Sequence, residues 1–199
     1  MTAPTSRLPL LITCVLVSVH SFAVCQGPPA QGDDASPHSG QLSGADSSIT
    51  LVPPRLISDL PEALRSKLEA CGCLIPQVYA GNRLNAVTGR FERAEQLDWA
   101  VLCSRRGVSR IYVFWGGSPN HPSRLAARPD QPTPDERGRT CYPRLIGVGD
   151  AERVRINHSP AKLGFPDPTY DVLVDNVSSD EYVTLYYRHK GRWVKFRPR

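Results

Sequence analysis

Two segments of the chain repeat one pattern of apolar and polar positions, and each predicts a β-hairpin. They are DWAVLCSRRGVSRIYVFW, residues 98–115, and EYVTLYYRHKGRWVKF, residues 181–196. In both, runs rich in β-branched and aromatic residues flank a glycine, as in two strands joined by a tight turn. An apolar run before each hairpin, at residues 85–93 and 170–177, extends each unit to a three-stranded meander.

A three-stranded sheet with one uncovered apolar face is marginal in water, so the two meanders are expected to share one core. Side chains alternate between the faces of a strand, and either face is allowed for each set by this period of two. The side chains predicted to form a common layer are Trp99, Val101, Ile111 and Val113 in the first unit and Val183, Leu185, Val194 and Phe196 in the second.

One amphipathic helix is predicted before the first meander, over residues 61–71. Pro61 suits the first helical turn and Gly72 suits the position just after the last. The apolar stripe of this helix consists of Leu60, Leu64, Leu68 and Cys71. The helix is therefore expected to cover an apolar surface.

The segment between the meanders, residues 116–140, holds five prolines and three glycines and predicts a long surface loop. Beyond it, residues 142–149 and 152–157 are candidate strands, and Ser159 followed by Pro160 predicts a short helix with Ser159 as its cap. The predicted fold class is α+β: two antiparallel three-stranded β-meanders that share a core, one N-terminal amphipathic helix, and disulfides that hold them together.

Residues 1–25 have the pattern of a secretory signal peptide, because Arg7 precedes an apolar run that ends in a polar tail. A transmembrane anchor is the alternative, but the run is near the lower limit for a bilayer span and contains polar residues. Cleavage is expected after Ala23 or after Cys25. A lipoprotein signal is disfavoured because the bulky Val24 precedes the cysteine.

The next segment, residues 26–50, is built mainly from Gly, Pro, Ser, Asp and Gln. Such a composition buries too little apolar surface to offset the entropy of ordering, so a disordered spacer is predicted. Residues 51–199 then form a single α+β domain. The expected localisation is outside the cytoplasm, in the periplasm or the extracellular space.

Two of the six cysteines lie in the predicted signal peptide, and the other four are Cys71, Cys73, Cys103 and Cys141. In an oxidising compartment an even set predicts two disulfides. A bond between Cys71 and Cys73 would close a strained ring. The choice left open is Cys73 with Cys103 and Cys71 with Cys141, or the crossed arrangement. Zinc is disfavoured, since structural zinc sites space their paired ligands more widely.

Charge supplies the one candidate binding surface. The chain has a formal net charge of +5, and its last twelve residues contain no acid. The candidate residues for contact with an anionic surface are Arg188, Lys190, Arg192, Trp193, Lys195 and Arg197. The competing interpretation is that these cations lie on solvent-facing positions and guard an edge strand.

No catalytic constellation, cofactor motif or metal-ligand set is recognised in the sequence. The domain cysteines are assigned to disulfides, which leaves no free thiol for a Cys–His pair. The glycines of WGGSPN are not followed by a helix that carries lysine, so they do not form a phosphate-binding loop. The alternative function is an exported hydrolase or enzyme inhibitor, with a site in residues 116–140 that would gather His121, Asp135 or Glu136.

The segments GRFERAEQLDWAVLCSRRGVSRIYVFW and YDVLVDNVSSDEYVTLYYRHKGRWVKF resemble an uncharacterised group of small exported bacterial proteins. That group has a G-x-F…DWAVLCS…G hairpin, and it implies that Cys73 pairs with Cys103. The hairpins are also distantly similar to the half-blade repeats of integrin-type (FG-GAP, VCBS-like) propellers. Those repeats bind calcium through Asp-rich loops, which this chain lacks, so the resemblance implies no calcium site.

The expected function is that of an exported, non-enzymatic domain with a binding or structural role in the cell envelope. An anionic envelope polymer or another exported protein is the expected kind of partner. Nucleic acid is not expected outside the cell.

Overall fold

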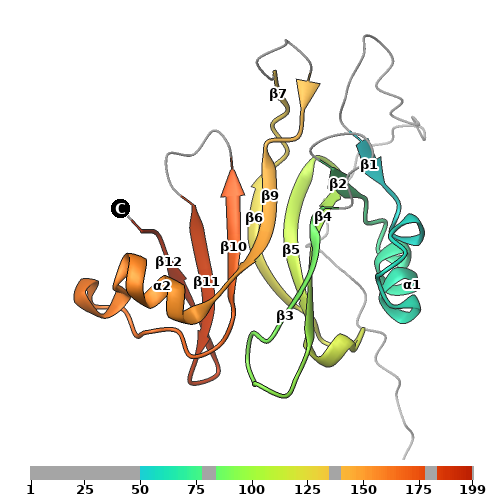
Figure 1. Ribbon diagram of the computed structural model, residues 1–199. Coiled ribbons are helices and arrows are strands. Elements are labelled where there is room, and N and C mark those ends of the chain that lie inside the picture. Colours follow the sequence, from blue (N-terminus) through green and yellow to red (C-terminus); the bar gives the residue numbers. More distant parts are fainter. Residues whose placement is uncertain (1–49, 78–83, 135–139, 178–182, 199) are drawn as a thin grey trace, which may run out of the picture. The chain divides into compact units, whose positions relative to one another are not determined.

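Two four-stranded antiparallel sheets and two α-helices dominate the computed structural model (Figure 1). The structure describes residues 50–77, 84–134, 140–177 and 183–198, all within one unit, Gly32–Arg199. The predicted signal peptide and almost all of the predicted spacer therefore lie outside the described residues. Within these ranges, no helix has the length and apolar content that a bilayer span requires.

The first sheet has the strand order β3-β4-β5-β6, and the second has the order β12-β11-β10-β9. The strands of the first are β3 (Ala86–Gly89), β4 (Asp98–Arg105), β5 (Val108–Phe114) and β6 (Ser123–Pro129). Those of the second are β9 (Arg144–Gly149), β10 (Val172–Val177), β11 (Thr184–His189) and β12 (Arg192–Phe196). Each predicted three-stranded meander is thus part of a four-stranded sheet.

The extra strand of the first sheet, β6, corrects the prediction that residues 116–140 form only a loop. Proline rarely occurs in a central strand because it lacks a backbone N–H. Pro129 is tolerated because β6 lies at the edge of its sheet and pairs only with β5. The proline-rich segment therefore contains an edge strand that its sequence does not indicate.

The hairpins have the same tight turn, as the repeat predicts. In β4–β5 the turn residues are Arg106 and Gly107, with φ of 51° and 73°, and in β11–β12 they are Lys190 and Gly191, with φ of 48° and 73°. Positive φ at both central positions is the conformation that matches the twist of a two-residue hairpin, and glycine adopts it without strain.

One helix lies on each sheet (Figure 1). α1 (Glu62–Ala70), inside the predicted range of 61–71, buries Leu64 and Leu68 among β4 and β5 side chains. α2 (Ala151–His158) corrects the prediction of a strand at 152–157. Asp150 caps α2 by accepting a hydrogen bond from the backbone N–H of Arg153, at 2.9 Å.

Short elements complete the described part of the chain. The predicted short helix is a 3-10 helix, η3 (Pro160–Leu163), whose preceding Ser159 makes no side-chain capping bond and has a φ of 45°. β1 pairs with β2, and β7 pairs with β8. The remaining elements are β1 (Thr50–Val52), η1 (Pro54–Leu56), β2 (Ile75–Gln77), η2 (Trp115–Gly117), β7 (Thr133–Pro134) and β8 (Thr140–Cys141).

Both faces of each sheet contribute to buried clusters, which corrects the predicted common layer. Trp99 and Val101 pack with α1, whereas Ile111 and Val113 lie in a cluster that also holds side chains of the second sheet. Within the second sheet the predicted residues Val183, Leu185, Val194 and Phe196 pack with Val154 of α2 instead. The side chains of the second sheet in the mixed cluster are Ile146, Leu173, Tyr186 and the partly buried Trp193.

Cys73 and Cys103 form a disulfide, with 5.4 Å between their Cα atoms. It joins the chain after α1 to β4, and the neighbouring backbone of Leu74 forms a bridge with Ser104. Cys71 is also disulfide-bonded. Cys141 is buried and is the free cysteine of the described residues. The predicted bond between Cys71 and Cys141 is therefore wrong, as is the crossed arrangement.

Candidate functional site

A buried ion pair joins β9 and β10, two neighbouring strands of the second sheet. Arg144, at the start of β9, donates from Nε and Nη2 to the two carboxylate oxygens of Asp175 on β10, at 2.8 and 3.0 Å. Both side chains are almost fully buried, with 3% and 0% exposed. Such a bidentate pair combines charge with fixed geometry, and its cost of desolvation demands that every other donor is also satisfied.

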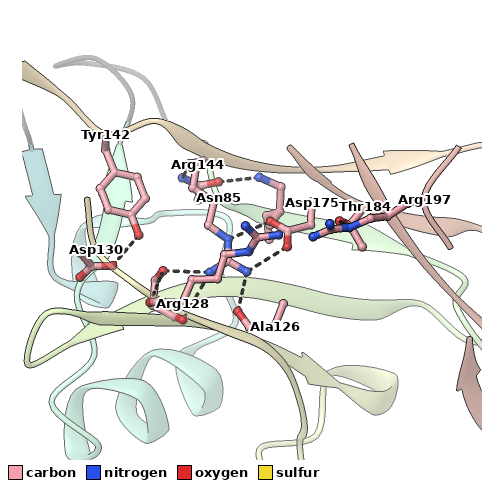
Figure 2. Close-up of polar contacts among 11 residues, drawn as sticks. Asn85, Ala126, Arg128, Asp130, Tyr142, Arg144, Asp175, Thr184 and Arg197 are labelled. Atoms are coloured by element: carbon pink, nitrogen blue, oxygen red, sulfur yellow. Dashed lines mark hydrogen bonds and ion pairs between the residues drawn. The ribbon is translucent and has the colours of Figure 1, made fainter. Parts of the chain in front are cut away.

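The first sheet satisfies the remaining donors of Arg144 (Figure 2). Nη1 donates to the hydroxyl and the carbonyl of Ser109 at 2.9 and 3.3 Å, and Nη2 also donates to the carbonyl of Ala126 at 2.7 Å. All five guanidinium N–H groups are thus used. Arg144 connects the two sheets and has no donor left for a ligand.

A β-bulge in β6 directs the Ala126 carbonyl toward Arg144. The register with β5 shifts between Ser109 and Ile111, and Ala126 has a φ of 53°. A non-glycine residue in this conformation is strained, at a cost of order 1 kcal/mol. The hydrogen bond to the buried guanidinium compensates for this strain.

Asn85 makes a second connection between the sheets. Its buried side chain donates to the carbonyl of Arg144 at 3.2 Å and accepts from the N–H of Ile146 at 2.8 Å. It also donates to the carbonyl of Pro76 at 2.8 Å. The side-chain amide therefore acts like an added peptide unit along the free edge of β9.

A carboxylate between two hydroxyls lies close to this network. Asp130 accepts a hydrogen bond from the hydroxyl of Tyr142, at 2.8 Å (Figure 2). It also accepts a hydrogen bond from the hydroxyl of Ser104. Burial, with a smaller contribution from the Asp130 charge, raises the pKa of Tyr142 above its usual range, so its phenol stays neutral. The group is arranged as a structural hydrogen-bond network, because each hydroxyl donates to the carboxylate and neither is activated as a nucleophile.

A cavity of about 140 Å³ opens beside Tyr142 and Arg144. Ligand pockets for drug-sized molecules usually measure about 300–1,000 Å³, so this one admits only a small group. Its lining residues are Ser109, Arg128, Pro129, Gln131, Tyr142, Pro143, Arg144 and Val177. Tyr142, Ser109 and Arg144 line this cavity, and their polar groups are already hydrogen-bonded within the protein.

Burial also raises the pKa of Tyr187, to about 12, and Asp167 adds to the effect. The folded protein keeps this phenol protonated at a pH where the unfolded chain ionises, near the ordinary pKa of 10.0. The contribution to stability is complete below about pH 10 and is lost as the pH rises toward about 12. Burial raises the pKa of Tyr186 too.

Tyr187→Phe is expected to remove this pH dependence together with the hydrogen bond to the carbonyl of Pro166, at 2.7 Å. The variant should be less stable than the parent by about 1 kcal/mol near neutral pH. The difference should shrink between about pH 10 and pH 12, as measured by urea unfolding. A difference that is constant over this range would show that the phenol titrates normally.

The predicted basic residues divide into two groups, of which the first is internal. The Arg188 guanidinium carbon lies 5.2 Å from the ring centre of Trp115 and 5.5 Å from that of Trp193. Arg188 also donates to Glu92 at 2.7 Å. Because the two indoles stack, with centres 5.7 Å apart, Arg188 and Trp193 hold the hairpin against the first sheet.

The second group faces solvent. Lys190, Arg192 and Lys195 are exposed, and none of their side chains has a hydrogen bond or an ion pair among the described residues. Arg197 is exposed as well and donates to the hydroxyl of Thr184 at 3.1 Å. These four cations lie on the turn, on β12 and just beyond it.

The alternative site in residues 116–140 is not assembled in the described residues. His121 is exposed and follows the 3-10 turn after β5, and Asp135 and Glu136 lie outside the described residues. Within the described ranges no group of three or more His, Cys, Asp or Glu side chains could hold a metal ion.

No family model, curated protein or solved structure matches the chain.

The sequence pattern did not predict the buried network of Arg144, Asp175 and Asn85, although the sequence contains one sign of a buried charge. Asp175 interrupts the apolar run VLVDNV at an inward position of a predicted strand, where a charge needs a buried partner. Arg144 and Asn85 carry no such local signal, since each is flanked by residues typical of a loop or a strand end.

Proposed function

We propose that this chain is an exported, non-enzymatic domain that binds an anionic partner in the cell envelope through the β11–β12 hairpin. The observation that carries the proposal is the set of three exposed cations without partners, Lys190, Arg192 and Lys195. Export is the part of the proposal that depends on the predicted signal peptide. The disulfide between Cys73 and Cys103 is consistent with an oxidising compartment.

The charge on this surface is not balanced locally. The described residues 183–198 contain no Asp or Glu, and the one acid bonded to the hairpin, Glu92, is paired with Arg188. Exposed cations that are not neutralised by the protein attract anions and increase their rate of association. The rigid contact of Arg188 with two indoles keeps the surface in place before binding.

The test is binding of a polyanion to the purified domain. Triple replacement by glutamate of Lys190, Arg192 and Lys195 is expected to weaken binding of polyphosphate by about tenfold or more, because each exposed ion pair contributes up to about 1 kcal/mol. Binding should also weaken as the ionic strength rises. Fluorescence anisotropy at two salt concentrations measures both effects.

A matched control separates the hairpin from net charge. Arg110, Arg153 and Lys162 are also exposed, and their replacement by glutamate changes the net charge equally. The control variant should keep most of the affinity. Equal losses in both variants, or no binding by the parent domain to any anionic probe, would contradict the proposed function.

A further inference from the structure

The four outer strands of the two main sheets differ in whether their unpaired backbone N–H and C=O groups are blocked. An edge strand presents unpaired N–H and C=O groups that can pair with another chain, and proteins usually block them. The edges here are β3 and β6 in one sheet and β9 and β12 in the other. Three of these four edges are blocked by contacts in the described residues.

The edge strands β3 and β9 lie against each other. At one end of the β3–β9 contact, the side chain of Asn85 is hydrogen-bonded to the carbonyl of Arg144 and to the N–H of Ile146 on β9. At the far end, Arg90 and Asp171 exchange hydrogen bonds: the N–H of Arg90 donates to the Asp171 carboxylate at 2.7 Å, and the N–H of Asp171 donates to the Arg90 carbonyl at 3.0 Å. An added strand has no access along this contact.

The third edge, β6, is interrupted. Its bulge at Ala126 breaks the regular spacing of backbone groups, and the carbonyl of Ala126 is bonded to Arg144. Pro129, in the same strand, has no N–H to offer. Bulges and prolines are both devices that prevent pairing at an edge.

β12 has neither device. Its five residues pair with β11 in an unbroken register, from His189 with Arg192 to Leu185 with Phe196. In a two-residue hairpin the pair next to the turn exchanges both hydrogen bonds, and the pattern alternates along the strand. The backbone groups of Trp193, Lys195 and Arg197 therefore point away from β11, and no described residue bonds to them.

The cationic side chains at this edge favour an added strand that carries acidic side chains. Lys195 lies on the face shared with Trp193 and Arg197, and Arg192 lies on the other face together with Val194. A second copy of β12 placed beside the first would bring like charges together. A strand with acidic side chains at alternate positions would pair with the cations on the face of Lys195 and Arg197.

We propose that an extended acidic peptide segment of another protein adds to the second sheet as a strand beside β12. This inference rests on the proposed function and names its partner. Backbone hydrogen bonds to Trp193, Lys195 and Arg197 provide affinity, and the acidic side chains provide selectivity. A membrane surface fits less well, because the large exposed apolar side chains of the described residues all lie outside the hairpin.

The experiment compares two acidic peptides of eight residues with glutamate at alternate positions and threonine or valine between them. The second peptide has the same sequence but is N-methylated at alternate backbone nitrogens, so that it keeps its charge and loses its edge hydrogen bonds. We expect the unmodified peptide to bind the full domain at least about tenfold more tightly. Hydrogen exchange should show new protection of the amides of Trp193, Lys195 and Arg197.

A pair of variants tests the same contact from the side of the domain. Lys195→Ala removes the charge alone, whereas Lys195→Pro removes both the charge and the outward N–H without a bond to β11 being lost. Lys195→Pro should bind the unmodified peptide several-fold more weakly than Lys195→Ala does. Both should bind polyphosphate, which has no peptide backbone, equally well. If Lys195→Pro does not fold, the comparison of the two peptides still decides the question.

Two results would distinguish failure of strand addition from failure of the proposed function. Equal affinity for the two peptides, without new protection at residues 193, 195 and 197, would overturn strand addition while binding of polyphosphate kept the proposed function. Absence of binding to both peptides and to polyphosphate would overturn both proposals.

Discussion

Replacing Asp175 by alanine is expected to lower the free energy of unfolding by about 3–5 kcal/mol, the largest effect of any single substitution considered for this chain. The Arg144 guanidinium would remain buried, 3% exposed, without its counter-ion. Its bonds to Ser109 and Ala126 would then have to compensate for an unpaired charge. Urea unfolding followed by tryptophan fluorescence measures the loss.

A double variant distinguishes the cost of a lone charge from the contribution of the pair. Arg144→Met with Asp175→Leu removes both charges, although it leaves the Ala126 carbonyl without the guanidinium donor. Because isolated buried charges are costly and apolar pairs of similar volume are not, this variant should be more stable than Asp175→Ala. A double variant that is less stable than the single one would mean that the ion pair itself is strongly stabilising.

Removing the disulfide by Cys73→Ala with Cys103→Ala should cost about 2–5 kcal/mol. The bond joins residues separated by 30 positions, so its loss releases a long loop in the unfolded chain. It also frees the segment after α1 from β4, and hydrogen exchange should therefore increase first in α1 and β2. Unfolding in denaturant gives the overall change.

Cys141 provides the control for this experiment. It is buried with a free thiol that donates weakly to the carbonyl of Thr133, at 3.4 Å. Cys141→Ala should cost less than loss of the disulfide, since it removes only a small buried side chain. Labelling of the denatured, unreduced protein should modify Cys141 and leave Cys73 and Cys103 protected; labelling of these two would contradict the bond.

The cations of β12 can both guard an edge strand and bind an acidic partner. The sequence alone leaves Lys195 and Arg192 as either binding residues or guards of an edge strand. The structure shows that the other edges of the two sheets are blocked by side chains, a bulge and a proline. A cationic guard excludes further copies of this chain, and the same charges admit an acidic strand.

Local features of the sequence predicted the hairpins well. The turns at Gly107 and Gly191 and the apolar runs around them depend on the φ that a few residues can adopt and on side-chain period, which neighbouring residues encode. The helix range of 61–71 follows from the same kind of local pattern, and α1 lies inside it. Residues 152–157 were predicted as a strand, whereas they lie in α2, which Asp150 caps.

Tertiary contacts decided what the pattern could not. Since both faces of each sheet contribute to buried clusters, the period of two could not show whether Leu185 packs toward α2 or toward the other sheet. β6 exists because an edge position tolerates Pro129, which local propensity counts against a strand. The sequence by itself determined the repeated hairpins and the cationic character of the last strand; the pairing of Arg144 with Asp175, Ser109 and Ala126 was decided only by the fold, because a buried charge is stable only where distant segments bring every one of its partners together.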